Sequence, residues 1–294
     1  MTTSVAAIQM VSGNDVETNL ARAKVLIAQA AERGAQLLVL PEAFALFISQ
    51  EQQQLGASEA GPRPRVRTFL AEQAALHKVW IVGGTIPVLD EIAIPEKAEK
   101  GDAANASKNS AKARPRAASF LIDASGREVA RYDKMHLFDV DVNDKQGSYR
   151  ESNTFAPGDA VVTVPTPFGC VGMAVCYDLR FPELFQQLRL QGAEVIVVPS
   201  AFTRKTGLAH WLPLLRARAI ETQCYFIGAN QGGEHSATRH TSGGSVIVDS
   251  WGTVLAESAF GESVITATID LEKLKRERGT MPVIQHRRFD IALK

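Results

Sequence analysis

The chain of 294 residues is 45% hydrophobic, and its 32 basic residues balance its 32 acidic ones. This composition supports a substantial core, whereas a formal net charge of zero gives no general electrostatic attraction for nucleic acid or an anionic membrane. The longest apolar runs are too short to span a bilayer, and the N-terminus lacks the pattern of a signal peptide. We therefore expect a cytoplasmic protein with neither nucleic acid nor membrane as a partner.

The order of apolar and turn-forming segments predicts an α/β fold. Runs such as 37–40 are continuously apolar, as is typical of strands covered on both faces. The first predicted helix can be capped by Asn14 or Asp15 and can end at Gly34. Strands alternate with helices along most of the chain, which is typical of α/β proteins. In chain order we predict strands at 4–10, 37–40, 79–84, 119–122, 128–132, 161–164, 170–175, 195–198, 226–229, 245–248 and 263–269, and helices between 15 and 34 and at 65–77, 183–190 and 209–222.

No linker divides the chain, so we interpret residues 1–294 as one domain. Residues 95–116 differ from the rest, because they contain several lysines and arginines and almost no large apolar side chain. Such a stretch cannot bury enough surface to offset its ordering entropy. We expect a flexible, solvated basic insertion there; the alternative is an arm that binds anions.

No cofactor is expected from the sequence. The three cysteines are odd in number and widely spaced, and the histidines are scattered, so neither a disulfide framework nor a metal site is indicated. None of the paired glycines fits a phosphate-binding loop.

Cys176 follows a short apolar run and precedes Pro182, which suits the first position of a helix. A thiol in a turn between a buried strand and a helix can be exposed beside converging backbone N–H groups, as a nucleophile requires. The simpler interpretation is a small buried hydrophobic residue.

Two charged residues also follow predicted strands. Glu42 comes just after the run 37–40, at the end of the sheet where ligands bind in open α/β folds, and partial burial there would suit a general base. Lys134 ends the second strand of a predicted hairpin, where its ammonium could stabilise an oxyanion. An exposed loop glutamate and a surface lysine paired with Asp133 or Asp139 are the alternatives.

The three residues occur within motifs that resemble the nitrilase superfamily of carbon–nitrogen hydrolases. The motifs are Leu-Val-Leu-Pro-Glu at 38–42, Tyr-Asp-Lys-Met-His-Leu-Phe-Asp-Val at 132–140 and Gly-Met-Ala-Val-Cys-Tyr-Asp-Leu-Arg-Phe-Pro-Glu at 172–183. The resemblance implies a four-layer α-β-β-α sandwich that usually forms a homodimer or larger homo-oligomer. It also implies a hydrolase of carbon–nitrogen bonds other than peptide bonds.

The family's roles carry over residue by residue. The resemblance makes Cys176 the nucleophile, Glu42 the general base and Lys134 the oxyanion-stabilising cation, with Glu151 as a second glutamate. The backbone N–H of Tyr177 is the expected second oxyanion donor. We also expect Lys134 to favour the thiolate form of the cysteine.

The substrate class follows from the same motifs. Tyr177-Asp178 replaces the Trp-Glu of nitrile-cleaving members, and the segments 138–141 and 147–152 are similar to enzymes that hydrolyse deaminated glutathione. We therefore expect hydrolysis of a small carboxylate-bearing amide to an acid and ammonia through a thioester. Deaminated glutathione is the preferred substrate, and α-ketoglutaramate, the substrate of ω-amidases, is the alternative.

A guanidinium would suit such a carboxylate. Arg180 is the first candidate and Arg204 the second, with Thr203 as a pocket wall. Arg180 could instead form a structural ion pair with Asp178 or Glu183. Three other functions stay open at this stage: a nitrilase, a thiol hydrolase that uses one of the histidines, and a binding module without catalysis.

Overall fold

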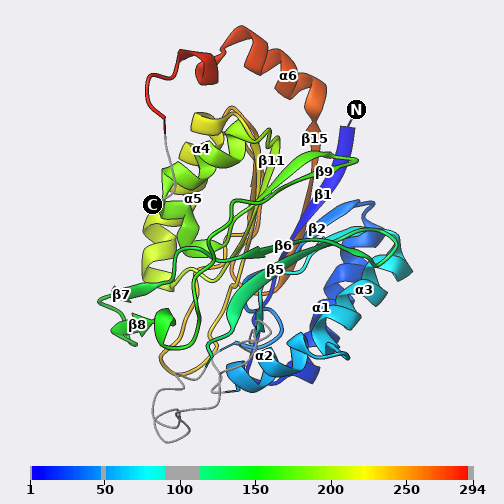
Figure 1. The fold of residues 1–294 in the computed structure, drawn as a ribbon, viewed down its shortest axis with the longest axis vertical. Coiled ribbons are helices and arrows are strands. Elements are labelled where there is room, and N and C mark those ends of the chain that lie inside the picture. Colours follow the sequence, from blue (N-terminus) through cyan, green and yellow to red (C-terminus); the bar gives the residue numbers. More distant parts are fainter. Residues whose placement is uncertain (1, 48–50, 90–112, 291–294) are drawn as a thin grey trace, which may run out of the picture.

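Two β-sheets pack face to face in the structure, a computed structural model that describes residues 2–47, 51–89 and 113–290, and helices cover the outer face of each sheet (Figure 1). The layers are therefore α-β-β-α. The four-layer sandwich predicted from the sequence is confirmed.

Among the described residues, the first sheet has seven strands in the order β15-β1-β2-β3-β5-β4, with β6 paired to β5. The strands β1, β2 and β3 are parallel, whereas β15 runs antiparallel to β1. The first and last strands of the sandwich are thus neighbours. The strand bounds are β1 Thr2–Gln9, β2 Leu37–Val39, β3 Trp80–Val82, β4 Ile86–Val88, β5 Arg116–Ile122, β6 Glu128–Asp133 and β15 Ser263–Asp270.

The second sheet has six strands within the described ranges, in the order β14-β13-β12-β11-β10-β9. Its central strands β10, β11 and β12 are parallel. A separate hairpin, β7 with β8, lies beside the sandwich. The bounds are β7 Asp139–Asp141, β8 Ser148–Arg150, β9 Thr163–Thr166, β10 Gly169–Met173, β11 Val195–Ser200, β12 Tyr225–Asn230, β13 Val246–Val248 and β14 Val254–Glu257.

Helices α1 and α3 cover the first sheet, and α4 and α5 cover the second (Figure 1). Helix α1 begins after Asp15, whose side chain accepts a hydrogen bond from the Thr18 N–H, as an N-cap residue does. Helix α2 packs on β4, and α6 follows β15. The bounds are α1 Val16–Glu32, α2 Gln52–Ala60, α3 Arg65–His77, α4 Pro182–Leu190, α5 Arg204–Thr222 and α6 Leu271–Thr280, with short 3-10 helices η1 Glu151–Asn153, η2 Cys176–Arg180 and η3 Val283–His286.

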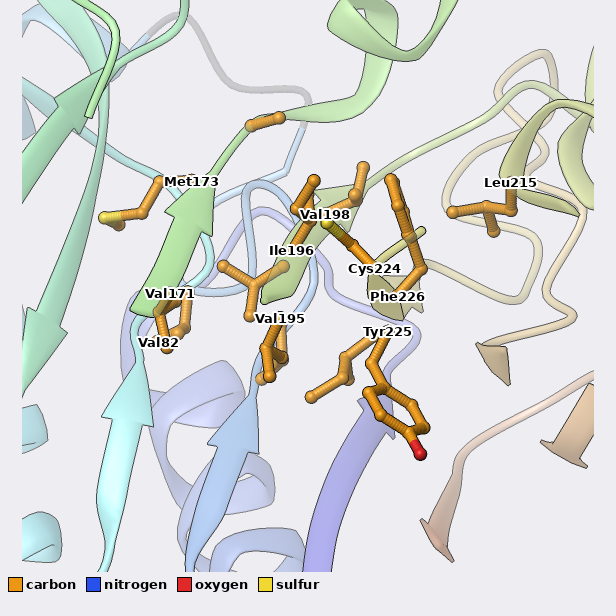
Figure 2. Packing of buried hydrophobic residues seen from close by; sticks show 14 of the residues in the cluster. Val82, Val171, Met173, Val195, Ile196, Val198, Leu215, Cys224, Tyr225 and Phe226 are labelled. Carbon is orange, nitrogen blue, oxygen red and sulfur yellow. The ribbon is translucent and has the colours of Figure 1, made fainter. Parts of the chain in front are cut away.

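The alternation of side chains along the strands builds the core between the sheets. In β1, Val5 and Ala7 join the cluster that lies between the two sheets, while Ala6 and Ile8 point toward the α1 and α3 layer. Figure 2 shows part of the first cluster, with Val82 from the first sheet and side chains from the second. The strands β2, β11 and β12 are buried at every residue because both of their faces are covered.

The sequence located most of these elements but missed some. The predicted helix at 65–77 matches α3, whereas α5 begins five residues earlier than its prediction because Thr203 caps it by accepting a hydrogen bond from the Thr206 N–H. The polar helix α2 and the charged helix α6 were not predicted, nor were the short strands β4, β7, β8 and β14. Most of the predicted basic insertion at 95–116 lies outside the described residues. Across the described ranges, no helix is long and apolar enough to cross a membrane.

Candidate active site

The sequence-predicted residues Glu42, Lys134 and Cys176 lie at the ends of strands from both sheets. Glu42 follows β2 and Lys134 follows β6, both in the first sheet, whereas Cys176 begins η2, after β10 of the second sheet. All three, with Glu151, line one cavity of about 290 Å³. The structure therefore brings together residues that are more than 130 positions apart in the chain.

Lys134 lies between two carboxylates. Its side chain is only 2% exposed, and Nζ lies 2.7 Å from Glu42 Oε1 and 2.7 Å from Glu151 Oε2. Burial opposes the charge on the lysine, but Glu151 and Glu42 outweigh it and raise its pKa well above the usual value. Burial is also the main reason why the pKa of Glu151 is raised, against the opposing effect of Lys134. Lys134 is thus held as a cation at a fixed point in the cavity.

The turn after β2 fixes Glu42. The next residue, Ala43, has a φ of 54°, in the left-handed region, and its N–H donates to Thr85 Oγ1 at 2.9 Å. The side chain of Gln231 donates to the backbone carbonyl of Glu42 at 3.0 Å. These bonds hold the turn in a conformation that a non-glycine residue seldom adopts.

Cys176 also has a left-handed backbone, with a φ of 47°, at the turn from β10 into η2. Burial raises the pKa of its thiol well above the ordinary value, the charge of Glu42 adds to the effect, and Lys134 opposes it. Lys134 therefore lowers the pKa of the thiol, as expected from the sequence, but burial and Glu42 outweigh its effect. The thiol is protonated at neutral pH, and Glu42 is the carboxylate next to it that can accept its proton.

Asp178 connects the segment that carries the cysteine with the segment that carries the lysine. Its buried carboxylate accepts hydrogen bonds from Tyr132 Oη at 2.7 Å and from the Val175 N–H at 2.8 Å. Its other oxygen lies 2.7 Å from Nδ1 of His136 and accepts the backbone N–H of the same residue at 3.1 Å. The sequence had suggested Asp178 only as a partner for Arg180.

The remaining predicted site residues divide between the cavity and the surface. Tyr177, Arg180 and Thr203 line the cavity. The Arg180 guanidinium lies over the rings of Tyr177 and Phe202, and its Nη1 is 3.3 Å from His210 Nδ1. In the described structure it forms no ion pair with Asp178 or Glu183, so that alternative is not supported.

Arg204 lies outside the cavity. It is exposed, and its guanidinium stacks over Phe260, 5.0 Å from the ring centroid. The contact with substrate that the sequence suggested for Arg204 is therefore not supported.

The sequence missed part of the cavity wall. Aromatic side chains form much of it, and Arg239, from the loop between β12 and β13, lies among them. No periodicity or motif marked Arg239 itself. The aromatic residues that line the cavity are Phe47, Phe138, Tyr149, Phe155, Tyr177 and Phe202.

The chemistry of the cavity belongs to the thiol, the two carboxylates and the ammonium. None of the described residues that line the cavity is a histidine, so a Cys-His pair is not supported. No group of three or more His, Cys, Asp or Glu side chains in the described part of the chain is arranged to hold a metal ion. The set provides a nucleophile, a proton acceptor and a fixed cation.

A family model for carbon–nitrogen hydrolases matches residues 4–278, and the chain belongs to that family. It is a hydrolase acting on carbon–nitrogen bonds other than peptide bonds, as the sequence predicted. The chain is 42% identical over 286 residues to the deaminated glutathione amidase of Yersinia enterocolitica. The aligned residues cover 97% of this chain and 93% of that protein.

Two solved structures resemble the fold. Saccharomyces cerevisiae Nit3, a member of branch 10 of the nitrilase superfamily, is 30% identical with a TM-score of 0.81, over 98% of this chain and 97% of that one. The Caenorhabditis elegans NitFhit protein is 35% identical, also with a TM-score of 0.81, over 98% of this chain; the match spans 65% of that longer chain.

Proposed function

We propose that this protein is an amidase that forms a thioester on Cys176. The observation that carries the proposal is the buried Lys134, held at 2.7 Å from each of Glu42 and Glu151 in the cavity that also contains the thiol. A cation fixed beside a nucleophile stabilises the negative charge that develops on an attacked carbonyl oxygen.

In the first half of the reaction, Glu42 accepts the thiol proton as the Cys176 sulfur bonds to the amide carbon. The oxyanion is stabilised by Lys134 and by the backbone N–H of Tyr177. Glu42 then donates the proton to the amide nitrogen, the carbon–nitrogen bond breaks, and the amine leaves. A thiol that is protonated before the reaction fits this order of steps, because the proton that the leaving nitrogen needs is already in the site.

In the second half, Glu42 takes a proton from water, which attacks the thioester. The oxyanion forms again beside Lys134, the carbon–sulfur bond breaks, and Glu42 returns the proton to the sulfur. Glu151 contacts the opposite side of the ammonium and accepts the Phe138 N–H at 2.6 Å. We assign it the role of positioning Lys134.

Deaminated glutathione is the substrate that we propose. The support is the 42% identity to an amidase of that name and a cavity that combines aromatic walls with Arg180 and Thr203. The nitrogen that leaves this substrate carries cysteinylglycine, so the second product is this amine and not the ammonia expected from the sequence; α-ketoglutaramate would release ammonia. Both reactions produce 2-oxoglutarate.

The test is to incubate the purified protein with deaminated glutathione, α-ketoglutaramate and a simple aliphatic nitrile, and to measure 2-oxoglutarate, the amine and ammonia by chromatography. We expect the highest kcat/KM for deaminated glutathione and no product from the nitrile. A higher kcat/KM for α-ketoglutaramate than for deaminated glutathione would contradict the proposed substrate but not the proposed amidase activity. The absence of amide hydrolysis would overturn the proposal.

We also propose that residues 1–294 act as one catalytic domain in the cytoplasm, as a homodimer or larger homo-oligomer. The family match over 4–278 and the hydrophobic cluster shared by both sheets support a single unit. Exposed apolar side chains support self-association: Leu208 and Ile220 on α5, and Trp251 between β13 and β14. Sedimentation of the purified chain measures its oligomeric state.

A further inference from the structure

Arg239 lies on the wall of the catalytic cavity but has no role in the mechanism above. It is half-buried on the loop between β12 and β13. Its guanidinium carbon is 4.6 Å from the centre of the Tyr149 ring and 5.5 Å from that of the Phe47 ring. Two aromatic faces therefore hold the cation in place.

Part of the hydrogen-bonding capacity of Arg239 is unused. Its Nη1 is buried without a hydrogen-bond partner, its Nη2 has a long contact of 3.5 Å with the Ala201 carbonyl, and the Tyr149 side chain is a further polar neighbour. No carboxylate in the described part of the chain forms an ion pair with it. A buried donor of a charged group without a partner is costly, so such a group in a cavity fits an anionic ligand.

The nearby charged and titratable groups do not satisfy Arg239. Asp144 interacts with it electrostatically, but one carboxylate oxygen of Asp144 accepts the N–H groups of Gln146 and Gly147 and the other accepts Tyr149 Oη at 2.8 Å. Burial lowers the pKa of His235 to about 4, so this neighbour is neutral at pH 7. Asp144 instead fixes the ring on which Arg239 stacks.

The two guanidinium groups of the cavity lie on different segments. Arg180 follows Cys176 in η2, whereas Arg239 packs on Phe47, in the segment that follows Glu42. During hydrolysis the acyl part of the amide stays on the sulfur, and the amine part receives its proton from Glu42. Arg239 thus packs on the segment that follows the residue from which the departing amine takes its proton.

We propose that Arg239 binds a carboxylate on the amine part of the substrate and so determines specificity. A guanidinium can bind a carboxylate through two parallel hydrogen bonds, and Nη1 has no partner in the protein that a carboxylate would have to displace. Deaminated glutathione ends its amine part in a glycine carboxylate, whereas the leaving nitrogen of α-ketoglutaramate carries no such group. This inference rests on the proposed function and names the contact that selects between the two substrates.

The test compares kcat/KM of the wild type, Arg239→Gln and Arg239→Lys for three substrates: deaminated glutathione, its analogue with a C-terminal glycine amide, and α-ketoglutaramate. We expect Arg239→Gln to lower kcat/KM for deaminated glutathione about 10- to 100-fold, mainly through KM. The ratio of kcat/KM for deaminated glutathione to kcat/KM for α-ketoglutaramate should fall by a similar factor. Arg239→Lys keeps the positive charge but loses the guanidinium that can form two parallel hydrogen bonds, so its kcat/KM for deaminated glutathione should lie between those of the wild type and Arg239→Gln. The exposed Arg276 on α6 provides the matched control, Arg276→Gln.

The glycine amide analogue makes the test independent of the folding of any variant. In the wild type, kcat/KM for the glycine amide analogue should be lower than that for deaminated glutathione, by the same factor by which Arg239→Gln lowers kcat/KM for deaminated glutathione. Arg239→Gln should have similar kcat/KM values for both compounds. No discrimination by the wild type, or equal losses on all three substrates, would overturn the Arg239 assignment and leave the amidase standing. No turnover of any of the three by the wild type would overturn the proposed function and this inference with it.

Discussion

Replacing Lys134 with methionine removes the cation that two buried carboxylates share. The side chain of Lys134 is 2% exposed and those of Glu42 and Glu151 are 11% and 16% exposed, so little water can replace it. Removing one partner of a buried ion pair costs about 3–5 kcal/mol in the free energy of unfolding. At about 2–4 °C per kcal/mol for a large domain, Tm should fall by roughly 6–20 °C.

The loss of stability should depend on pH. Burial already raises the pKa of Glu151, and removing Lys134 removes the effect that opposes this. A carboxyl group whose pKa is raised by folding stabilises the protein while it is protonated, and that contribution is lost as pH rises through its folded-state value. The Tm difference between variant and wild type should therefore be larger at pH 8 than at pH 5, and the added substitution Glu151→Gln should recover part of it.

Circular dichroism melts at several pH values and kcat with the preferred amide provide the two readouts. We expect kcat to fall on the order of 10²-fold or more, as when an oxyanion donor is removed. The exposed Lys275 on α6 is the control, as Lys275→Met. An unchanged Tm at pH 7 would refute the buried ion-pair argument, and a higher KM with unchanged kcat would show that Lys134 only binds substrate.

Three further outcomes are expected. Cys176→Ala should abolish turnover and barely change Tm, since both residues are small; full amidase activity in this variant would remove the nucleophile. Glu42→Gln should slow both halves of the reaction, and mass spectrometry of the variant with substrate would find an acyl adduct on Cys176 if the second half is slowed more; turnover near that of the wild type would contradict the base assignment. Because burial raises the pKa of Cys176 well above its usual value of about 8.5, kcat/KM should stay level from pH 7 to 9, whereas a tenfold rise per pH unit would indicate attack by a free thiolate.

The apolar runs predicted the α/β order of strands and helices for a physical reason, whereas the resemblance to the family implied the four-layer sandwich and the roles of the reactive residues. Glu42, Lys134 and Cys176 each directly follow a strand or a short extension of one, and apolar runs make strand ends readable in a sequence. Their motifs then specified the family. Whether each residue has its assigned role stays a prediction for the mutants above.

The rest depends on contacts that no local pattern contains. The sequence offered Asp178 as one alternative partner of Arg180, but its partners Tyr132 and His136 lie more than 40 positions away and reach it only when the sheets pack. Arg239 lies on a loop without periodicity, and its contacts with Tyr149 and Phe47 bring it to the cavity. The protonation of Cys176 depends on the balance of burial and two opposite charges, which a sequence does not reveal.

The pairing of the first strand with the last affects how the enzyme can acquire activity during synthesis. Strand β1 lies between β2, which leads to Glu42, and β15, which it contacts along residues 2–9 and 263–270. A chain emerging from the ribosome therefore presents β1 with one unpaired edge until residue 270 is made, although Cys176 and Lys134 were added long before. Hydrolysis should begin only after the last strand docks, so activity appears late and all at once rather than in step with chain length.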